Sequence, residues 1–245
     1  MKKFAVFDID GTVFRWQLYS DVVFQLIEDG YIPQEVKTEL NVKMSQWRER
    51  THAHSFREYE LAVVKAFYTH LKNIPVSAME AAAETVISRN GTHVYLYTKG
   101  LIEQLKRENY ILIAISGSHN EIVQKFAELW QFDIALGQAH AAENNTYIAS
   151  EPTVDELVIF RKGEILKELV KQHDLEWTGS IAVGDSKSDA NMLEIVENPI
   201  AFNPNEELFS IANERGWKVV IERKNMIYEL EKNDGTYVLE NASAR

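Results

Sequence analysis

The sequence predicts an α/β fold in which helices cover a parallel sheet and a helical segment is inserted after the first strand. Several short segments of the chain are near-continuously apolar, as expected for strands that are buried on both faces of a parallel sheet. Helical spacing fills the intervals between most of these runs. Residues 16–96 differ, because they show helical spacing almost throughout and contain no convincing strand.

Five apolar runs are expected to form the strands of the sheet. The strands are predicted at residues 3–7, 110–116, 180–184, 199–203 and 217–221. Helices are predicted at residues 118–132, 162–173 and 189–197. Ser118 and Glu121 fit a capping box, which predicts that the first of these helices begins directly after its strand. Beyond Glu222 the apolar pattern decays, and we expect the last residues of the chain to fray.

The inserted helical segment is about eighty residues long, too many for a simple crossover between two strands. Pro33 and Pro75 stand where helices could begin, because proline is well tolerated in the first helical turn. We therefore expect residues 16–96 to form a helical cap. The α/β core is expected to consist of residues 1–15 and 97–245.

The composition limits the class of protein. The 245 residues are 45% hydrophobic, enough for a packed core, and the formal net charge of −11 argues against nucleic acid as the main partner. We expect no membrane association, because no run approaches the roughly 18 uncharged apolar residues that a membrane span requires. A signal peptide is not expected at the N-terminus either, because the apolar run after the two lysines ends at Asp8. The absence of cysteine excludes disulfides and thiolate chemistry. A cytoplasmic location is the default expectation, and the oligomeric state is left open.

Polar side chains gather where the predicted strands end. The motifs there are Asp8, Asp10, Gly11 and Thr12 in DIDGT, Ser116 in SGS, Lys162 ahead of the third strand, and Asp185 and Asp189 in GDSKSDANML. Ligands of open α/β sheets bind beyond the carboxyl ends of the strands, so these side chains are expected to meet. Burying neighbouring carboxylates is costly, which indicates that water or a positive group sits among them.

In this order and spacing the motifs resemble those of the haloacid dehalogenase superfamily, and most of all its phosphoserine-phosphatase-like branch. The resemblance covers roughly residues 1–14 and 97–221 and includes the trailing PIAFNPNEEL. It implies a Rossmann-like parallel sheet with a helical cap that selects the substrate. It also implies Mg²⁺-dependent hydrolysis of a small phosphorylated metabolite through an aspartyl-phosphate.

The resemblance implies a role for each acidic residue. Asp8 is expected to be the nucleophile, and Asp10 the acid that protonates the leaving oxygen and then the base that activates water. Residues two apart in extended backbone point the same way, so Asp10 can face the same phosphoryl group as Asp8. Asp8, the main-chain carbonyl of Asp10 and Asp185 are the implied Mg²⁺ ligands. Asp189 is expected to support that shell or to hold Lys162.

Thr12, Ser116, Gly117 and Lys162 are the residues expected to bind the phosphoryl oxygens. Hydroxyl, backbone amide and ammonium groups all donate hydrogen bonds to such oxygens, and Lys162 also balances charge during catalysis.

Each motif also has a plainer interpretation. DIDGT could be an ordinary Asp-Gly turn, Ser116 a strand-end residue, and Lys162 one solvated lysine among several basic neighbours. Asp189 could be an aspartate favoured at a helix start by the dipole. An EF-hand Ca²⁺ loop does not fit, because Val13 and Tyr19 stand where glycine and glutamate are required.

Two rival functions share part of the pattern. A phospho-acceptor signalling module has an acidic Mg²⁺ pocket, a hydroxyl and a lysine, but its phosphorylated aspartate belongs on a later strand and it has no eighty-residue cap. A phosphoryl-transferring mutase shares the DxD motif and a helical cap. Both alternatives stay open at the level of sequence.

The sequence gives few signals about the substrate. Phosphoserine phosphatases carry an acidic residue shortly after the first motif, whereas this chain has none before Asp21 and has Arg15 and Trp16 instead. That difference favours a more anionic or aromatic leaving group. Further polar and aromatic residues of the segment are expected to be helix surface or core: Trp47, Arg48, Arg50, His52, His54 and Arg57.

Overall fold

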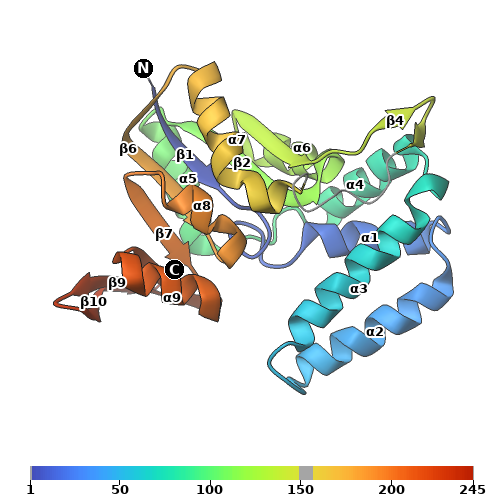
Figure 1. The fold of residues 1–245 in the computed structure, drawn as a ribbon, viewed down its shortest axis with the longest axis horizontal. Helices are drawn as coiled ribbons and strands as arrows, with labels where there is room; N and C mark the ends of the chain where they lie inside the picture. Colours follow the sequence, from blue (N-terminus) through green and yellow to red (C-terminus); the bar gives the residue numbers. More distant parts are fainter. Residues whose placement is uncertain (1, 149–156, 245) are drawn as a thin grey trace.

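The computed structural model describes residues 2–148 and 157–244, and within them one mixed sheet forms the centre of the protein. Its strand order is β10-β9-β8-β7-β6-β1-β2-β3, parallel from β3 to β8 and antiparallel at β9 and β10. The strands are β1 (Lys2–Phe7), β2 (Ile111–His119), β3 (Ile134–Gln138), β6 (Leu175–Gly184), β7 (Asn198–Phe202), β8 (Lys218–Arg223), β9 (Met226–Asn233) and β10 (Thr236–Ala244). The five predicted strands are present, and the predicted α/β class is confirmed (Figure 1).

Helices cover both faces of the parallel part of the sheet. In β1, Ala5 and Phe7 belong to one buried apolar cluster while Phe4 and Val6 belong to another, because successive side chains of a strand point to opposite faces. This explains why the run is apolar throughout. The helices of the core are α5 (Leu96–Arg107), α6 (Asn120–Trp130), α7 (Val158–Gln172), α8 (Ala190–Leu193) and α9 (Glu206–Arg215), with a 3-10 turn η3 (Lys187–Asp189).

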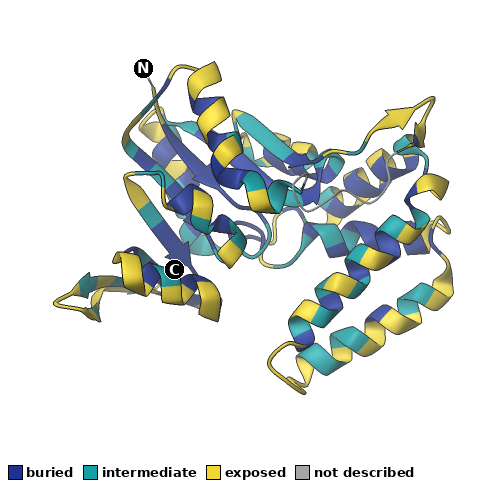
Figure 2. Ribbon diagram, viewed as in Figure 1, coloured by how far each residue is buried: buried dark blue, intermediate teal, exposed yellow. Residues whose placement is uncertain are grey.

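The segment between β1 and α5 is helical, as its spacing predicts. It contains α1 (Leu18–Glu28), α2 (Gln34–Arg48), α3 (Ser55–His70), the 3-10 turn η1 (Leu71–Asn73) and α4 (Val76–Asn90). Pro33 and Pro75 directly precede α2 and α4. Figure 2 shows that α2 and α3 project from the sheet with many exposed residues on their outer faces, whereas α1 is largely buried. One apolar cluster runs continuously from the sheet into these helices.

The two chain connections to this helical segment lie side by side. Arg15 N donates to His93 O (2.8 Å), Tyr95 N donates to Val13 O (3.0 Å), and Phe14 forms a bridge with Val94. The entry and the exit of the segment are therefore held together by backbone hydrogen bonds at one place.

The predicted capping box at Ser118 and Glu121 is wrong. Strand β2 continues through His119, and α6 begins at Asn120 without a side-chain cap from His119 among the described residues. His119, the residue after Ser118, pairs with Gln138 of β3, so Ser118 lies within the strand and not at a helix start. A capping box forms instead between Ser186 and Asp189.

The expectation of a frayed C-terminus is also wrong. Strands β9 and β10 form an antiparallel hairpin whose pairing reaches Ala244. Asp234 (φ 47°) and Gly235 (φ 82°) both have positive φ, as a type I′ turn requires, and Asp-Gly between alternating residues is a strong hairpin signal.

A second small hairpin, β4 (Ala142–Glu143) and β5 (Thr146–Tyr147), follows β3 and touches the start of α4. Among the described residues, no helix combines the length and the apolar character that crossing a membrane requires.

Candidate active site

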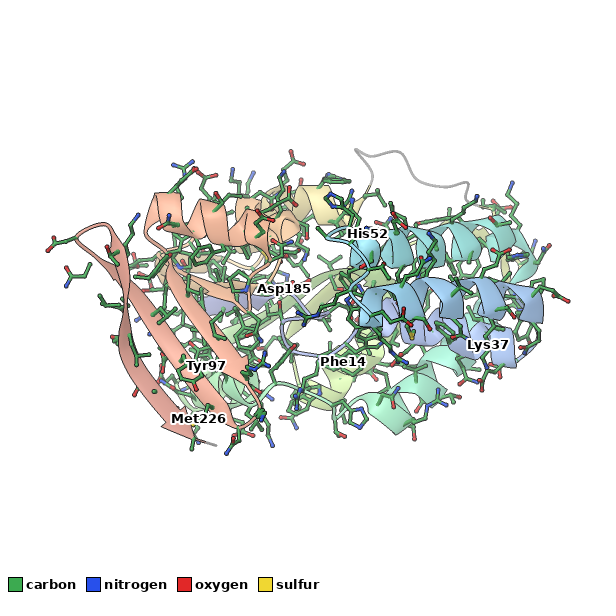
Figure 3. The ribbon with its side chains drawn as sticks, turned by 90° about the horizontal axis from the view of Figure 1, so that it is seen from below. Phe14, Lys37, His52, Tyr97, Asp185 and Met226 are labelled. Atoms are coloured by element: carbon green, nitrogen blue, oxygen red, sulfur yellow. The ribbon has the colours of Figure 1, made fainter. Side chains whose placement is uncertain are left out.

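The ends of β1 and β6 place two aspartates beside each other. The strands are parallel and pair Phe7 with Val183, so the residues that follow them leave the same edge of the sheet. Asp8 N extends this pairing by donating to Val183 O (3.0 Å). Figure 3 shows Asp185 between the sheet with its helices and the projecting helical segment. The sequence-predicted meeting of the first and last motifs is therefore observed.

Lys162 on α7 joins two of the aspartates. Its side chain is buried, and Nζ lies 2.5 Å from Asp8 Oδ1 and 2.6 Å from Asp189 Oδ1. Burial alone would lower the pKa of Lys162, but the charges of Asp189 and Asp8 more than reverse this effect and raise it. Lys162 is therefore a buried cation held by two anions, not a solvated surface lysine.

Asp189 is fully occupied by hydrogen bonds from the protein. Oδ1 accepts from Lys162, while Oδ2 accepts from the amides of Asp185 (3.0 Å) and Ser186 (2.9 Å). Gly184 is required for this packing, because a Cβ there would lie 2.4 Å from Asp189 Cβ. Asp189 thus fixes both the loop after β6 and the lysine, which fits a supporting position better than direct ligation of an ion.

Asp8 and Asp185 have oxygens that could hold a cation. Together with Asp189 they form a group whose ligand atoms all lie within 4.8 Å of one another. Burial, the largest cause, raises the pKa of Asp8 to about 7 and that of Asp185 well above its ordinary value, and the neighbouring carboxylates add to both shifts. One lysine does not balance this negative charge. Closely spaced carboxylate oxygens with excess negative charge are a donor set that suits Mg²⁺.

Gly11 is needed beside Asp185 for two reasons. Its φ of +82° lies in the left-handed region, and a Cβ at this position would come within 2.2 Å of Asp185 Oδ2. Any side chain at position 11 would therefore displace the carboxylate that the metal would use.

Asp10 is held by two donors. Leu18 N at the start of α1 donates to Oδ1 (2.6 Å), and the Ser118 hydroxyl donates to Oδ2. Burial raises the pKa of Asp10 to about 6, while the hydrogen bonds from Ser118 and Leu18 oppose this rise. Ser118 is a site residue that the sequence reasoning missed. The available signal was the second serine of SGS, because residues two apart on β2 point the same way.

The other residues expected to bind phosphate differ in their hydrogen bonds and in their packing. Ser116 is buried, and its Oγ accepts from Ser118 N (3.0 Å), which leaves its hydroxyl proton free to donate. Gly117 packs against α7, where a Cβ would lie 2.2 Å from Ile159 Cγ2. Thr12 is buried, and among the described residues its hydroxyl has no hydrogen-bond partner.

The polar and aromatic residues after the first motif and in the helical segment contact one another or the chain connections. Gln17 Nε2 donates to Glu60 Oε1 (2.6 Å), and Trp16 stacks on Trp47 at 4.9 Å between ring centroids. Arg15 lies over the ring of Tyr95, 5.4 Å from its centroid. His52 is exposed and lies 3.6 Å from Glu58.

A family model for haloacid dehalogenase-like hydrolases matches residues 5–194, which include all four motifs. The chain belongs to this family. The match confirms the sequence-based resemblance and the prediction of a hydrolase. It covers the strands, loops and helix that carry Asp8, Ser116, Lys162 and Asp185.

Within the haloacid dehalogenase-like hydrolases, the chain is similar to phosphoserine phosphatases. It is 22% identical to the phosphoserine phosphatase of Methanocaldococcus jannaschii over 82% of this chain and 85% of that protein. A structure titled as a phospho-aspartyl intermediate analogue of phosphoserine phosphatase has a TM-score of 0.59 at 22% identity, covering 91% of this chain and 94% of that one. A Bordetella pertussis Tohama I protein with unknown function has a TM-score of 0.68 at 17% identity, with 91% and 99% covered.

These likenesses confirm the predicted branch and enzyme class: the chain is a phosphoserine-phosphatase-like phosphoric monoester hydrolase.

Proposed function

We propose that this protein is a Mg²⁺-dependent phosphatase that hydrolyses a small phosphomonoester through a phosphoryl group carried on Asp8. This proposal rests on the cluster in which buried Lys162 bridges Asp8 and Asp189 while Asp185 lies beside them. A phosphomonoester is a dianion, so its site must supply positive charge and hold the attacking group in line.

Asp8 is the proposed nucleophile. Lys162 binds its Oδ1, and no residue in the described part of the chain engages Oδ2, which is left to attack phosphorus. A bond forms between Oδ2 and phosphorus while the bond from phosphorus to the leaving oxygen breaks. Asp8, Asp185 and the carbonyl of Asp10 would hold a Mg²⁺ ion, which would supply positive charge to the phosphoryl oxygens.

Asp10 moves the protons in both half-reactions. It donates a proton to the leaving oxygen, and it then takes a proton from the water that attacks the phosphorylated Asp8. Its pKa of about 6 suits both tasks near neutral pH, because neither protonation state is strongly disfavoured there. Leu18 and Ser118 hold the carboxyl in place throughout.

The phosphoryl oxygens are proposed to bind Lys162, the Ser116 hydroxyl and the amide of Gly117. Thr12 stays in this proposal as a donor, because its buried hydroxyl is unsatisfied among the described residues. Residues 16–96 are proposed to form the cap that selects the leaving group, over a core of residues 1–15 and 97–245.

The two aspartates of the first motif give the sharpest test. Asp8→Asn removes the nucleophile, so turnover should stop and no covalent phosphate should form. Asp10→Asn keeps the nucleophile, so an aryl phosphate with a good leaving group should still phosphorylate Asp8. Because water is no longer activated, hydrolysis should slow by roughly 10²–10⁴-fold.

Intact mass spectrometry measures the covalent phosphate on each variant. The Asp10 variant should accumulate a species heavier by about 80 Da, the mass of one phosphoryl group, and the Asp8 variant should not. The reverse pattern would exchange the two roles. A stable phosphoprotein in the unmutated chain without phosphate release would favour a signalling module, and transfer to a sugar without release of inorganic phosphate would favour a mutase.

A further inference from the structure

The two outermost strands of the central sheet, β3 and β10, differ in how their free sides are covered. Side chains of α6 bind the backbone of β3: Asn120 Oδ1 accepts from Gly137 N (3.2 Å), and Gln124 Nε2 donates to Ala135 O (2.8 Å). These contacts occupy backbone groups that a further strand would need. Strand β3 is also short, with five residues. Its free side is therefore covered by α6.

Strand β10 has nine residues, and among the described residues no side chain blocks the backbone on its outer side in this way. Native sheets commonly protect an outermost strand with proline, lysine or another charge. The only charged residue of β10 is Glu240, which reaches inward over β9 to Lys218 of β8 (3.0 Å). Its charge therefore does not guard the outer side. Figures 1 and 3 show the β9–β10 hairpin at the end of the molecule remote from α2 and α3.

Apolar side chains are exposed along β10. Val238 is 43% exposed and Leu239 is 57% exposed. The exposed ring of Phe209 on α9 lies 5.7 Å from the ring of Tyr237, whose hydroxyl donates to Trp217 O (2.7 Å). Leu239 lies on the same face of the sheet as Tyr237, because residues two apart on a strand point the same way. Phe209, Tyr237 and Leu239 thus form an apolar patch that reaches the outer side of β10.

The hairpin turn determines which backbone groups of β10 point outward. The turn has two residues, 234–235, so the flanking Asn233 and Thr236 are a pair that exchanges both hydrogen bonds. Hydrogen-bonded and non-hydrogen-bonded pairs alternate, so the N–H and C=O groups of Tyr237 and Leu239 point away from β9. The pairing with β9 is regular up to Leu239, where the register shifts. The outer side therefore offers a short, regular stretch to a partner strand.

We propose that β10 pairs with β10 of a second copy of this chain, antiparallel and about a two-fold axis at Val238. Val238 then faces the same residue of the second copy, and Tyr237 of each copy faces Leu239 of the other. The outward groups of Tyr237 and Leu239 exchange both hydrogen bonds in this register. Glu240 faces Thr236, so no like charges are directly opposite. Leu239 of one copy covers the apolar patch of the other.

A second copy is the occupant that this strand fits, because its outer side is complementary to itself. A two-fold axis at Glu240 would set two carboxylates opposite each other, whereas the axis at Val238 brings apolar side chains together. The paired stretch is short, so the dimer should be weak, with a Kd on the order of 10 μM. The hairpin lies outside residues 5–194, so the surface is not part of what the chain shares with its family through that match.

Val238→Cys tests the register, because the chain has no cysteine of its own. Directly opposite residues of a non-hydrogen-bonded antiparallel pair have Cα atoms about 4.5 Å apart, within reach of a disulfide. With diamide as the oxidant, the full chain should form a linked dimer on a non-reducing gel. Thr236→Cys is the matched control, because its Cα would lie about 14 Å from the same residue of the second copy, too far to bridge. Equal linkage of the two variants would overturn the proposal.

Sedimentation velocity of the unmutated protein tests the association itself. The net charge of −11 opposes association of two copies, so the measurement is made at physiological salt, which screens it. The average mass should rise from one chain toward two over about a hundredfold range of concentration around the Kd. A monomer at every concentration up to about tenfold above the expected Kd would overturn the proposal.

Charges at the two-fold axis provide an independent test. Val238→Lys and Val238→Glu each set like charges opposite one another, so in each variant alone the Kd should rise by about fivefold or more. An equal mixture of the two should dimerise again, because opposite charges then face each other. Val238→Thr, the neutral control, should dimerise nearly as the unmutated chain does. Val238 is exposed, so the variants should fold, which circular dichroism checks. A dimer that persists unchanged in both charged variants would place the interface elsewhere and refute the pairing of β10.

Discussion

The edge of the sheet and the projecting helices contribute different things to the site. At the edge, Lys162 binds both Asp8 and Asp189, and the three residues are positioned by α7, by the end of β1 and by the turn η3. Among the projecting helices, α3 packs beside α1, and Glu60 of α3 accepts a hydrogen bond from Gln17, which directly precedes Leu18, the residue whose amide binds Asp10. We therefore propose that the sheet edge holds the groups for chemistry common to all phosphomonoesters and that selection between leaving groups arises in the helices.

The largest expected effect is at the sheet edge. Asp185→Asn removes a negative ligand, so Mg²⁺ should bind much more weakly and turnover should fall by orders of magnitude at low Mg²⁺. The loss should be equal for esters with different leaving groups, measured as kcat/KM over a Mg²⁺ titration. EDTA should abolish the activity of the unmutated enzyme reversibly.

If the loss in Asp185→Asn depended on the leaving group, the sheet edge would also contribute to substrate selection, contrary to the proposed separation of roles between the edge and the helices. Full activity of the unmutated enzyme in EDTA would show that the acidic group does not use a metal.

The second prediction concerns the negative charge of the edge in the absence of metal. The folded-state pKa of Asp8 is raised from 3.8 to about 7, so the folded protein binds a proton more tightly than the unfolded chain does. This contribution to stability is present below about pH 4 and is lost as the pH rises toward 7. In EDTA the free energy of unfolding should therefore fall over this range by a few kcal/mol from this group.

Urea unfolding at pH 5 and pH 8 measures this effect. Added Mg²⁺ should restore most of the stability lost at pH 8, because it replaces the proton as the partner of the carboxylate. Asp8→Asn should show a smaller fall in EDTA than the unmutated chain. An identical fall in both proteins would mean that Asp8 does not cause it.

The acidic residues of the edge could be predicted from the sequence because parallel topology brings strand ends together. A run such as KFAVF followed by DIDGT predicts both the strand and the place of Asp8 and Asp10. Lys162 was predictable as a site residue only through the family resemblance, since nothing local to residues 158–172 shows that its side chain is buried.

Other contacts could not be predicted because they depend on tertiary packing. Ser118 reaches Asp10 only because β2 continues to His119. Glu60 lies within α3 at a position that helical spacing does not distinguish from Glu58, and the packing of α3 beside Gln17 decides which of the two accepts its hydrogen bond. The C-terminal hairpin does have a local signal, because Asp234 and Gly235 are residue types that favour a type I′ turn.

The third prediction tests one of these tertiary contacts. Ser118→Ala removes a hydrogen bond to the charged group of Asp10. We expect kcat on an alkyl phosphate to fall by roughly 10- to 100-fold, the rate equivalent of about 1.5–3 kcal/mol, with little change in KM. An aryl phosphate, whose leaving group needs little protonation, should lose less.

Ser180→Ala is the matched control, because Ser180 is a buried serine of β6 that accepts a hydrogen bond from Glu197 N away from the carboxyl edge. It should cost stability without changing the ratio between alkyl and aryl substrates. Equal effects of the two serine variants would remove Ser118 from the positioning of Asp10.

The smallest expected effect lies where the helical segment rejoins the core. Tyr95 supplies no side-chain cap to α5 among the described residues, and Glu222 of β8 accepts from Tyr97 N (2.9 Å) in its place. Glu222→Ala should therefore lower the free energy of unfolding by about 1 kcal/mol, the usual cost of losing a helix cap. Asn205→Ala, which removes the local cap of α9, should cost about the same.

Activity measurements on the Glu222 variant then test whether the attachment of the helical segment to the sheet affects substrate preference. Helix α5 follows directly after the paired connections at Val13 and Tyr95, so Glu222 ties this exit of the helical segment to the sheet. If the segment acts only through its own side chains, the preference between alkyl and aryl phosphates should be unchanged in Glu222→Ala. A change in that preference, with Asn205→Ala showing none, would mean that the anchoring of α5 also sets how the helices meet the leaving group, and selection would then belong partly to the core.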